Sequence, residues 1–371
     1  MGSAADSPIA VAVLIVVVVA FAWNLGVHYT GAVMGMPFAA RSIAEWPALL
    51  LTGIFTVVGA TFASGRVETT VGQNIITDSF VRVPDAIVIV LAAGGLTALY
   101  NYWRVPTSTI QILVFCVVGT GLAGGIPIHW GTIGSLAVVW VLAPIVAFAL
   151  GFAFTRLLDL VVPPAASRAQ AEAQTQSSAR EIVQTTWRGR VFPGVLLAWQ
   201  APPRLAMSTA RATLLALRLL PAVLVAVGVF ASFVLGANDV SNATGAFILT
   251  HLFSLTMAGL IGGLAMAAGS LTWGRRILHT VAFDVVKMDL NMASAAQGVQ
   301  ALVVIAAVTQ GFFTSMNQAL IGAMAGTGLA RGSETVQRKQ ILGILRGWLI
   351  GPFSALALAF VLERMVRILM S

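Results

Sequence analysis

The chain has 371 residues, of which 58% are hydrophobic and 9% are charged, and its mean hydropathy is +0.93. Soluble domains carry about a quarter charged residues, so this composition excludes a soluble globular protein and predicts an integral membrane protein. The net charge of +8 does not indicate nucleic-acid binding, because the arginines gather in loops and linkers and not in a domain with a reading motif. The single cysteine, Cys116, excludes a disulfide framework and a CxxC metal site.

Apolar runs close to the length of a membrane span follow one another along the chain. A transmembrane helix needs about 20 residues, and these runs lack the alternation of an outer-membrane barrel, so they predict helices. The first run has no basic segment before it and no convincing cleavage site, and we expect it to be a span and not a removable signal. The runs lie at 9–26, 47–64, 86–100, 109–126 and 134–155, then at 217–236, 245–270, 298–313, 318–331 and 341–363.

A polar segment separates the two sets of five runs. It is rich in Ala, Gln and Ser, and from Arg156 to Arg218 it has eight arginines against Asp159, Glu172 and Glu181. We interpret it as a partly disordered or amphipathic linker, and its positive charge predicts a cytoplasmic location. The predicted domains are therefore a first transmembrane repeat at 1–155, a cytoplasmic linker at 156–212 and a second transmembrane repeat at 213–371.

The two halves resemble each other in sequence. The segment "GVHYTGAVMG" from Gly26 matches "GANDVSNATG" from Gly236, and "GRVETTV" matches "GRRILHTV", both at an offset of 210 residues. Further on, "GTGLAGG" matches "GTGLARG" at an offset of 207, and "WVLAP" matches "WLIGP" at 208. Because each half holds an odd number of spans, the second half must enter the membrane from the opposite side. The sequence predicts an all-α membrane protein with about 10–12 transmembrane or half-membrane helices in two inverted-topology repeats, an architecture of secondary transporters.

The second-half motif Gly236–Gly245 places Asp239 between Asn238 and Asn242. A carboxylate inside a bilayer costs about 2.5–3.5 kcal/mol, so it should face water, a cation or a partner. The flanking glycines predict that the segment leaves helical geometry and offers carbonyl oxygens to a hard cation such as Na⁺, or to a proton relay. A helix-end cap is the structural alternative.

The first-half motif has lost this carboxylate. His28, Tyr29 and Ala32 stand where the second half has Asn238, Asp239 and Asn242. A histidine titrates near neutral pH and could carry a proton, although a structural hydrogen bond is the other reading. The candidate cation-coupling residues are Asn24, His28, Asn238, Asp239 and Asn242, and the last three form the candidate sodium site.

A second pair of segments contains hydroxyl groups beside a break in an apolar run. "RVPTSTIQ" (104–111) matches "GFFTSMNQ" (311–318) at the offset of 207, and Pro106 predicts the break in the first of them. Hydroxyls and free N–H groups at a helix start form a neutral anion cradle, while ordinary N-capping is the alternative. The candidate substrate-binding residues are Thr107, Ser108, Thr109, Gln111, Ser315, Asn317 and Gln318.

These motifs resemble the inorganic phosphate transporter family. "GANDVSNA" (236–243) is similar to its GANDVANA motif, "PTST" (106–109) to its P-x-S-T-T-H loop, and "GRRILHTV" to its G-K/R-R-V-x-E-T-V segment. The resemblance covers almost the whole chain outside the linker. It implies an inverted-repeat, cation-coupled phosphate carrier in which the Ser/Thr loops hold the anion and the Asn/Asp motifs hold the cation.

The chain departs from the family pattern at Tyr29, at Ala32 and in "SMNQ", which replaces S-T-T-H. In the bacterial sulfate permease branch of the family, these motifs depart from the pattern in a similar way. Phosphate keeps a proton that it can donate to a carboxylate, whereas sulfate is repelled by one, so Asp239 favours phosphate and the lost aspartate favours sulfate.

We therefore predict a secondary active symporter of inorganic phosphate in the cell membrane, coupled to sodium or protons. The alternatives are a proton-coupled sulfate permease and a passive anion channel. The absence of HExxH, GxSxG and Walker motifs argues against an enzyme, and no cofactor is expected. The expected partners are phosphate or sulfate and the lipid bilayer, and the sequence leaves a homodimer open.

Overall fold

The computed structural model describes residues 7–103, 107–173, 191–200, 211–284, 288–332 and 338–370. These residues are helical almost throughout and contain no β-strand, only an isolated bridge between Ile76 and Ile128. Seven helices in the described ranges are long and apolar enough to cross a membrane. The protein is therefore an all-α, multi-pass membrane protein, as the composition predicts.

The helices occur in the same order in both halves. The first half contains α1 (Pro8–Ala39), α2 (Glu45–Ala63), α3 (Gly65–Gln73), the short η1 (Asp78–Phe80), α4 (Val83–Trp103), α5 (Thr109–Gly124) and α6 (Trp130–Val161). The second contains α11 (Arg211–Asp239), α12 (Ser241–Leu249), α13 (Leu255–Thr272), α14 (Gly274–Asp284), α15 (Leu290–Thr309), α16 (Met316–Arg331) and α17 (Arg338–Met370). Between the halves lie α7 (Pro164–Ala173) and α10 (Pro193–Gln200).

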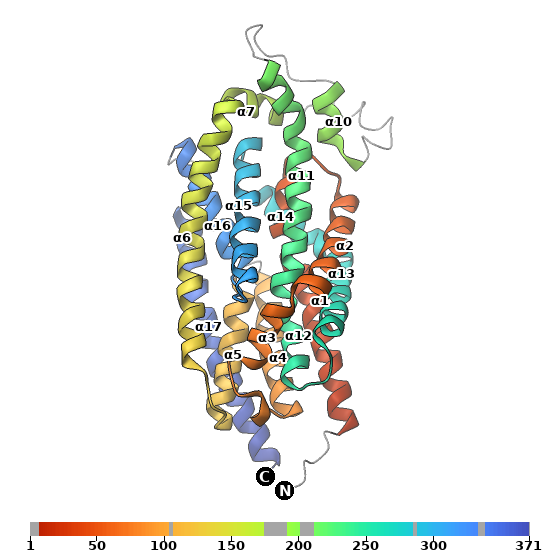
Figure 1. The fold of residues 1–371 in the computed structure, drawn as a ribbon, viewed down its shortest axis with the longest axis vertical. Coiled ribbons are helices and arrows are strands. Elements are labelled where there is room, and N and C mark those ends of the chain that lie inside the picture. The colour runs from red at the N-terminus through yellow and green to blue at the C-terminus, as the bar shows by residue number, and fades with distance from the viewer. Residues whose placement is uncertain are drawn as a thin grey trace.

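Corresponding helices of the two halves run in opposite directions. In Figure 1, α1 and α6 rise from the lower end of the molecule, whereas α11 and α17 descend from the upper end. The chain begins and ends at the lower end, and α7 and α10 lie at the upper end. The hairpin of α4 and α5 occupies the lower half of the view, and α15 and α16 occupy the upper half. This arrangement agrees with the predicted inverted duplication.

One predicted span is wrong at its start. The sequence predicts a continuous helix over 245–270, but α12 ends at Leu249 and α13 begins only at Leu255. The connection contains His251 at a φ of 54°, and Ser254 then caps α13 by accepting from the Met257 N–H at 3.4 Å. Apolar residues on both sides hide this turn from a hydropathy pattern. Residues 174–190 and 201–210 of the predicted linker, and the break predicted at Pro106, lie outside the described residues.

Glycines at matching positions allow the two halves to pack closely. A Cβ on Gly26 would lie 1.9 Å from the Met266 carbonyl oxygen, and one on Gly236 would lie 2.0 Å from that of Thr56. Gly236 and Met266 stand 210 positions after Gly26 and Thr56, the offset of the sequence repeat. The backbone contact between α1 and α13 is thus repeated between α11 and α2 with the halves exchanged. Small residues at such contacts are typical of membrane helix packing.

Replacing either glycine by alanine should therefore destabilise the fold. Gly26→Ala and Gly236→Ala are each expected to cost about 1–3 kcal/mol or more, because the new methyl group meets rigid backbone. Gly95→Ala is the matched control, since a Cβ there has no atom within 4 Å. Thermal unfolding in detergent measures the effect. Equal stability of all three variants would show that these helices separate more easily than their contacts indicate.

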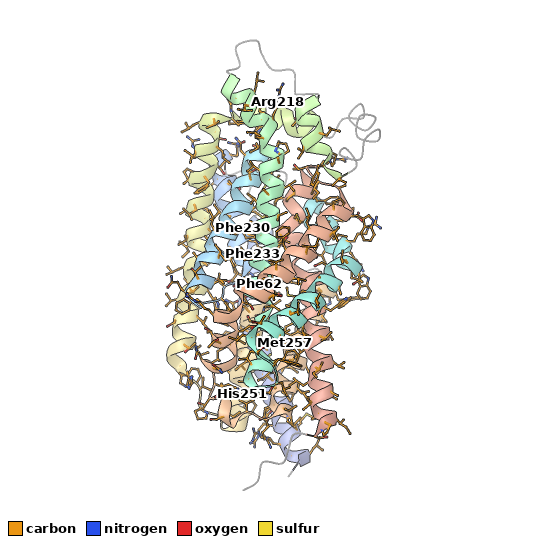
Figure 2. All side chains as sticks on the ribbon, turned by 45° about the vertical axis from the view of Figure 1, so that its right-hand side comes forward. Phe62, Arg218, Phe230, Phe233, His251 and Met257 are labelled. Atoms are coloured by element: carbon orange, nitrogen blue, oxygen red, sulfur yellow. The ribbon has the colours of Figure 1, made fainter. Side chains whose placement is uncertain are left out.

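Exposed apolar side chains cover the middle of the molecule. Figure 2 shows Phe62, Phe230 and Met257 at intermediate height, between Arg218 toward the upper end and His251 toward the lower end. Phe62 is 79% exposed, which is unfavourable in water but suits contact with lipid tails. The distribution places the hydrocarbon layer around the centre of the helix bundle.

Candidate functional site

Two helices from opposite halves begin near the centre of the protein. Ser108 precedes α5 and its Oγ accepts from the Gln111 N–H at 3.3 Å, while Ser315 precedes α16 and accepts from the Gln318 N–H at the same distance. In this conformation each serine therefore caps the start of its helix, which is the alternative that the sequence left open. The positive ends of both helices remain directed at the centre, and such ends attract anions.

The two helix starts touch each other through equivalent residues. Gln318 Nε2 donates to Gln111 Oε1 at 3.2 Å, and these glutamines are 207 positions apart, the offset that aligns the two loops. Both are at most 9% exposed. The predicted cradle residues of the two halves therefore meet in one buried place, which is closed to solvent in this conformation.

The motif Gly236–Gly245 contains a break between two helices. The helix α11 ends at Asp239 and α12 begins at Ser241, although Val240 between them keeps helical angles of φ −57° and ψ −37°. At this break the Asn238 carbonyl accepts from the Ser241 hydroxyl at 3.0 Å. The glycines also serve close packing, since a Cβ on Gly245 would lie 2.3 Å from the Val71 side chain.

Asp239 is fully buried and surrounded by hydrogen-bond donors. Asn238 Nδ2 donates to one carboxylate oxygen at 2.9 Å, and Asn242 Nδ2 lies 3.4 Å from the other. The Tyr29 hydroxyl also interacts with this carboxylate. No side chain caps α12 at its start, so the alternative of a helix-end cap is not observed for Asp239.

The same two asparagines join Asp239 to both cradle loops. Asn238 Nδ2 donates to the Thr314 carbonyl at 2.8 Å, and Asn238 Oδ1 accepts from the Thr314 N–H at 3.2 Å. Asn242 Nδ2 donates to Thr109 Oγ1 at 3.0 Å, and that oxygen lies 2.7 Å from the Tyr29 hydroxyl. Asp239 is thus linked through one asparagine to the start of α5 and through the other to the start of α16.

His28 lies in a chain of amides on the first-half side of the site. Its Nε2 accepts from Asn317 Nδ2 at 3.0 Å, and Asn317 also donates to the Thr107 carbonyl at 2.9 Å. Asn101 Nδ2 donates to Asn24 Oδ1 at 2.6 Å, so Asn101 Oδ1 is left to accept from His28 Nδ1. Both ring nitrogens of His28 are thus held by amide side chains. Asn24 is half-buried, and it is linked to His28 through Asn101.

Several buried polar atoms of the site have no hydrogen-bond partner among the described residues. Two are hydroxyls at equivalent positions beside the helix starts, Thr107 Oγ1 and Thr314 Oγ1. Two are amide oxygens, Asn242 Oδ1 and Gln318 Oε1. An unpaired buried polar atom costs about 1–3 kcal/mol, so a cluster of them indicates a ligand that supplies both acceptors and a donor.

The residues proposed for sodium fit a multi-oxygen cation site poorly. The Asn238 oxygen is occupied by the Thr314 N–H, and both asparagines turn N–H groups toward Asp239. Only the carboxylate and Asn242 Oδ1 remain as acceptors, whereas hard cations prefer several oxygen ligands. In this conformation the donors around Asp239 suit an ionised carboxylate, and few oxygens remain to hold a sodium ion.

Sequence reasoning missed three polar partners in the site. Thr314 is the repeat partner of Thr107, so the 207 offset could have found it. Tyr29 stands where the first repeat lacks an aspartate, and its hydroxyl contacts Asp239, the aspartate of the second repeat. Asn101, which bonds His28, gave no signal beyond being polar near the end of an apolar run.

Comparisons with known proteins agree with this fold. A family model described as the phosphate transporter family matches residues 25–359. The sulfate permease CysP of Bacillus subtilis is 23% identical over 92% of this chain and 84% of its own length. The chloroplastic inorganic phosphate transporter 2-1 of Arabidopsis thaliana is 24% identical over 89% of this chain and 67% of its own. A solved structure titled the sodium-dependent phosphate transporter matches with a TM-score of 0.79 at 20% identity, over 97% of this chain and 99% of that one.

Proposed function

Because the chain belongs to the phosphate transporter family, we propose that it is a secondary active symporter that moves inorganic phosphate together with a proton or sodium. The observation that carries the proposal is the bonding of Asp239 to both anion-cradle loops through Asn238 and Asn242. A negative carboxylate beside the cradle repels an oxyanion, and a cation bound to the carboxylate removes that repulsion. The two ligands therefore favour each other's binding, so that the doubly loaded carrier is populated in preference to the singly loaded one.

Phosphate fits the unpaired atoms better than sulfate. The Thr107 and Thr314 hydroxyls can donate to either oxyanion, but Gln318 Oε1 and Asn242 Oδ1 need a donor. Hydrogen phosphate carries a P–O–H group that can donate, and sulfate has none at neutral pH. Sulfate remains the second candidate, because a sulfate permease is among the relatives.

The domain division and orientation follow from the same proposal. We place the first repeat at 1–155, the linker at 156–212 and the second repeat at 213–371, in the cell membrane. The arginine excess of the linker favours a cytoplasmic position for α7 and α10. The two chain ends, which lie opposite these helices in Figure 1, would then be outside.

The Thr107 and Thr314 hydroxyls should serve the anion and not the fold. Thr107→Val and Thr314→Val remove hydroxyls that have no partner in the described protein. Each is expected to weaken phosphate affinity by about tenfold or more, the loss of one hydrogen bond to a charged group at about 1.5–3 kcal/mol. Thermal stability should be unchanged or higher. The control is Thr52→Val, whose hydroxyl donates to the Ala48 carbonyl at 2.9 Å and should affect stability alone. Unaltered affinity in both site variants would remove these hydroxyls from the cradle.

Competition between the two oxyanions tests the substrate. Labelled phosphate uptake into proteoliposomes should be inhibited by unlabelled phosphate at much lower concentrations than by sulfate. Labelled sulfate uptake should be weak and readily inhibited by phosphate. The reverse order of inhibition would identify a sulfate permease.

A further inference from the structure

A second buried carboxyl group lies outside the site described above. Glu68 belongs to α3, the short helix that follows α2, and its side chain is fully buried. Burying an ionised carboxylate without a counter-charge costs far more free energy than burying the protonated, neutral acid in the same place. The groups around Glu68 therefore determine whether its carboxyl group is protonated or ionised in this conformation.

Few donors are available to an ionised Glu68. Thr244 Oγ1 donates to Glu68 Oε1 at 2.8 Å, and it also donates to the Val240 carbonyl of its own helix at 3.0 Å. A hydroxyl has a single proton, so Thr244 shares it between these two acceptors. The Ser64 hydroxyl donates to the Ala60 carbonyl at 2.5 Å, and Glu68 Oε2 has no hydrogen-bond partner among the described residues. A protonated Glu68 needs fewer donors and can itself donate.

Charged groups do not compensate a carboxylate at this position. The helices packed against α3 include α12, α13 and α15, and none of these three contains a titratable residue. On α11 the titratable groups are Arg211 and Arg218, near its start at the upper end, and Asp239. On α3 itself, the Arg66 guanidinium donates to the Thr309 carbonyl. His251, in the turn before α13, lies 3.4 Å from Asp78.

Asp239 and Glu68 thus have opposite surroundings. Asp239 faces two amide N–H groups, which can only donate and so suit an ionised carboxylate, whereas Glu68 has one shared hydroxyl and an oxygen without a partner among the described residues. The separation of 2.8 Å between Glu68 Oε1 and Thr244 Oγ1 is that of an O–H···O hydrogen bond. It leaves no room for a metal ion between the two atoms. We propose that Glu68 is a proton-binding site of the transport cycle, protonated in this closed conformation and deprotonated when α3 and α12 separate.

The nine-residue helix α12 connects this group to the anion site. Asn242 on α12 bonds Asp239 and Thr109, and Thr244, two residues later, bonds Glu68. Any movement of α12 that opens the cradle must therefore alter the contacts of Glu68. A pocket of about 340 Å³ lies beside α3 and is lined by Thr69, Gln73 and His251 among others, but Glu68 does not line it in this closed conformation. Figure 2 places His251 toward the lower end, where the chain termini lie.

Glu68→Gln tests this inference, which rests on the proposed function. Glutamine has the size of the protonated acid but cannot release a proton. In proteoliposomes the variant should keep phosphate exchange at zero gradient and lose accumulation driven by an inward proton gradient by at least tenfold. Glu45→Gln, at a surface ion pair with Arg275, is the matched control and should behave as the wild type.

Infrared spectroscopy reads the proton directly and does not depend on transport. The carbonyl stretch of a protonated carboxylic acid should be present in the wild type and reduced in Glu68→Gln. Thr244→Val, which leaves the carboxyl in place, should shift this band and the pH midpoint of uptake together. The inference is overturned if Glu68→Gln accumulates phosphate like the wild type, if the band is unchanged, or if only a sodium gradient drives accumulation. Absence of phosphate and sulfate exchange in the wild type would instead overturn the proposed function, and the infrared band would still report on Glu68.

Discussion

Asp239→Asn is expected to abolish concentrative phosphate uptake while leaving phosphate exchange across the membrane intact. The substitution keeps the size of the side chain but removes the charge that attracts the coupling cation. The amides of Asn238 and Asn242, which now donate to the carboxylate, can reorient toward the new side chain. The variant should therefore fold, bind phosphate without needing a cation, and carry it only down its own gradient.

The measurement compares accumulation with exchange in the same proteoliposome preparation. Accumulation under an imposed proton or sodium gradient should fall to the level of empty vesicles, and exchange should persist. Asp78→Asn, the same change at a partly exposed position in η1, serves as the control. Full gradient-driven accumulation by Asp239→Asn would show that Asp239 has only a structural role.

Arg331→Met is expected to cause the largest loss of stability among the variants considered. Arg331, at the end of α16, pairs with Asp159 of α6 and with Asp289 before α15, the latter at 2.8 Å. The side chains of Arg331 and Asp289 are only 4% and 3% exposed. Removing the cation leaves two largely buried carboxylates uncompensated, which costs about 3–5 kcal/mol.

Unfolding in detergent, followed by temperature or denaturant, measures this loss. Arg275→Met is the control, because the Arg275 side chain is 67% exposed and Glu45 keeps His279 as a second partner, so the loss should be about 0–1 kcal/mol. Adding Asp159→Asn and Asp289→Asn to Arg331→Met should restore much of the stability. A loss for Arg331→Met no greater than that of Arg275→Met would contradict the assigned burial.

The repeated motifs predicted how the helices pack, because the residue offset between matching motifs also relates equivalent contacts in the structure. The 210 offset that aligns Gly26 with Gly236 also relates their contact partners, Thr56 and Met266. Likewise, the 207 offset that aligns Gln111 with Gln318 describes two side chains that bond each other. Residues at equivalent positions in a duplicated fold meet near the axis that relates the halves, so sequence symmetry located the candidate site.

Other features depended on contacts that a linear pattern does not show. The glycines of Gly236–Gly245 indicated the break between α11 and α12, but not the close approach of neighbouring chain segments that these glycines also allow. Glu68 is one charged residue near the end of an apolar run, and its burial follows only from the packing of α3 against α12. The turn before α13 is only five residues long, and the apolar sequence on both sides conceals it from a hydropathy pattern although it contains His251.

Accumulation of labelled phosphate by the purified wild-type protein in proteoliposomes tests the central claim most directly. With equal phosphate on both sides and an inward proton or sodium gradient, internal phosphate should rise above the external concentration. An ionophore that collapses the gradient should return it to equality. Uptake that only equilibrates phosphate, whatever gradient is imposed, would show a passive channel and contradict the coupling of Asp239 to the anion cradle.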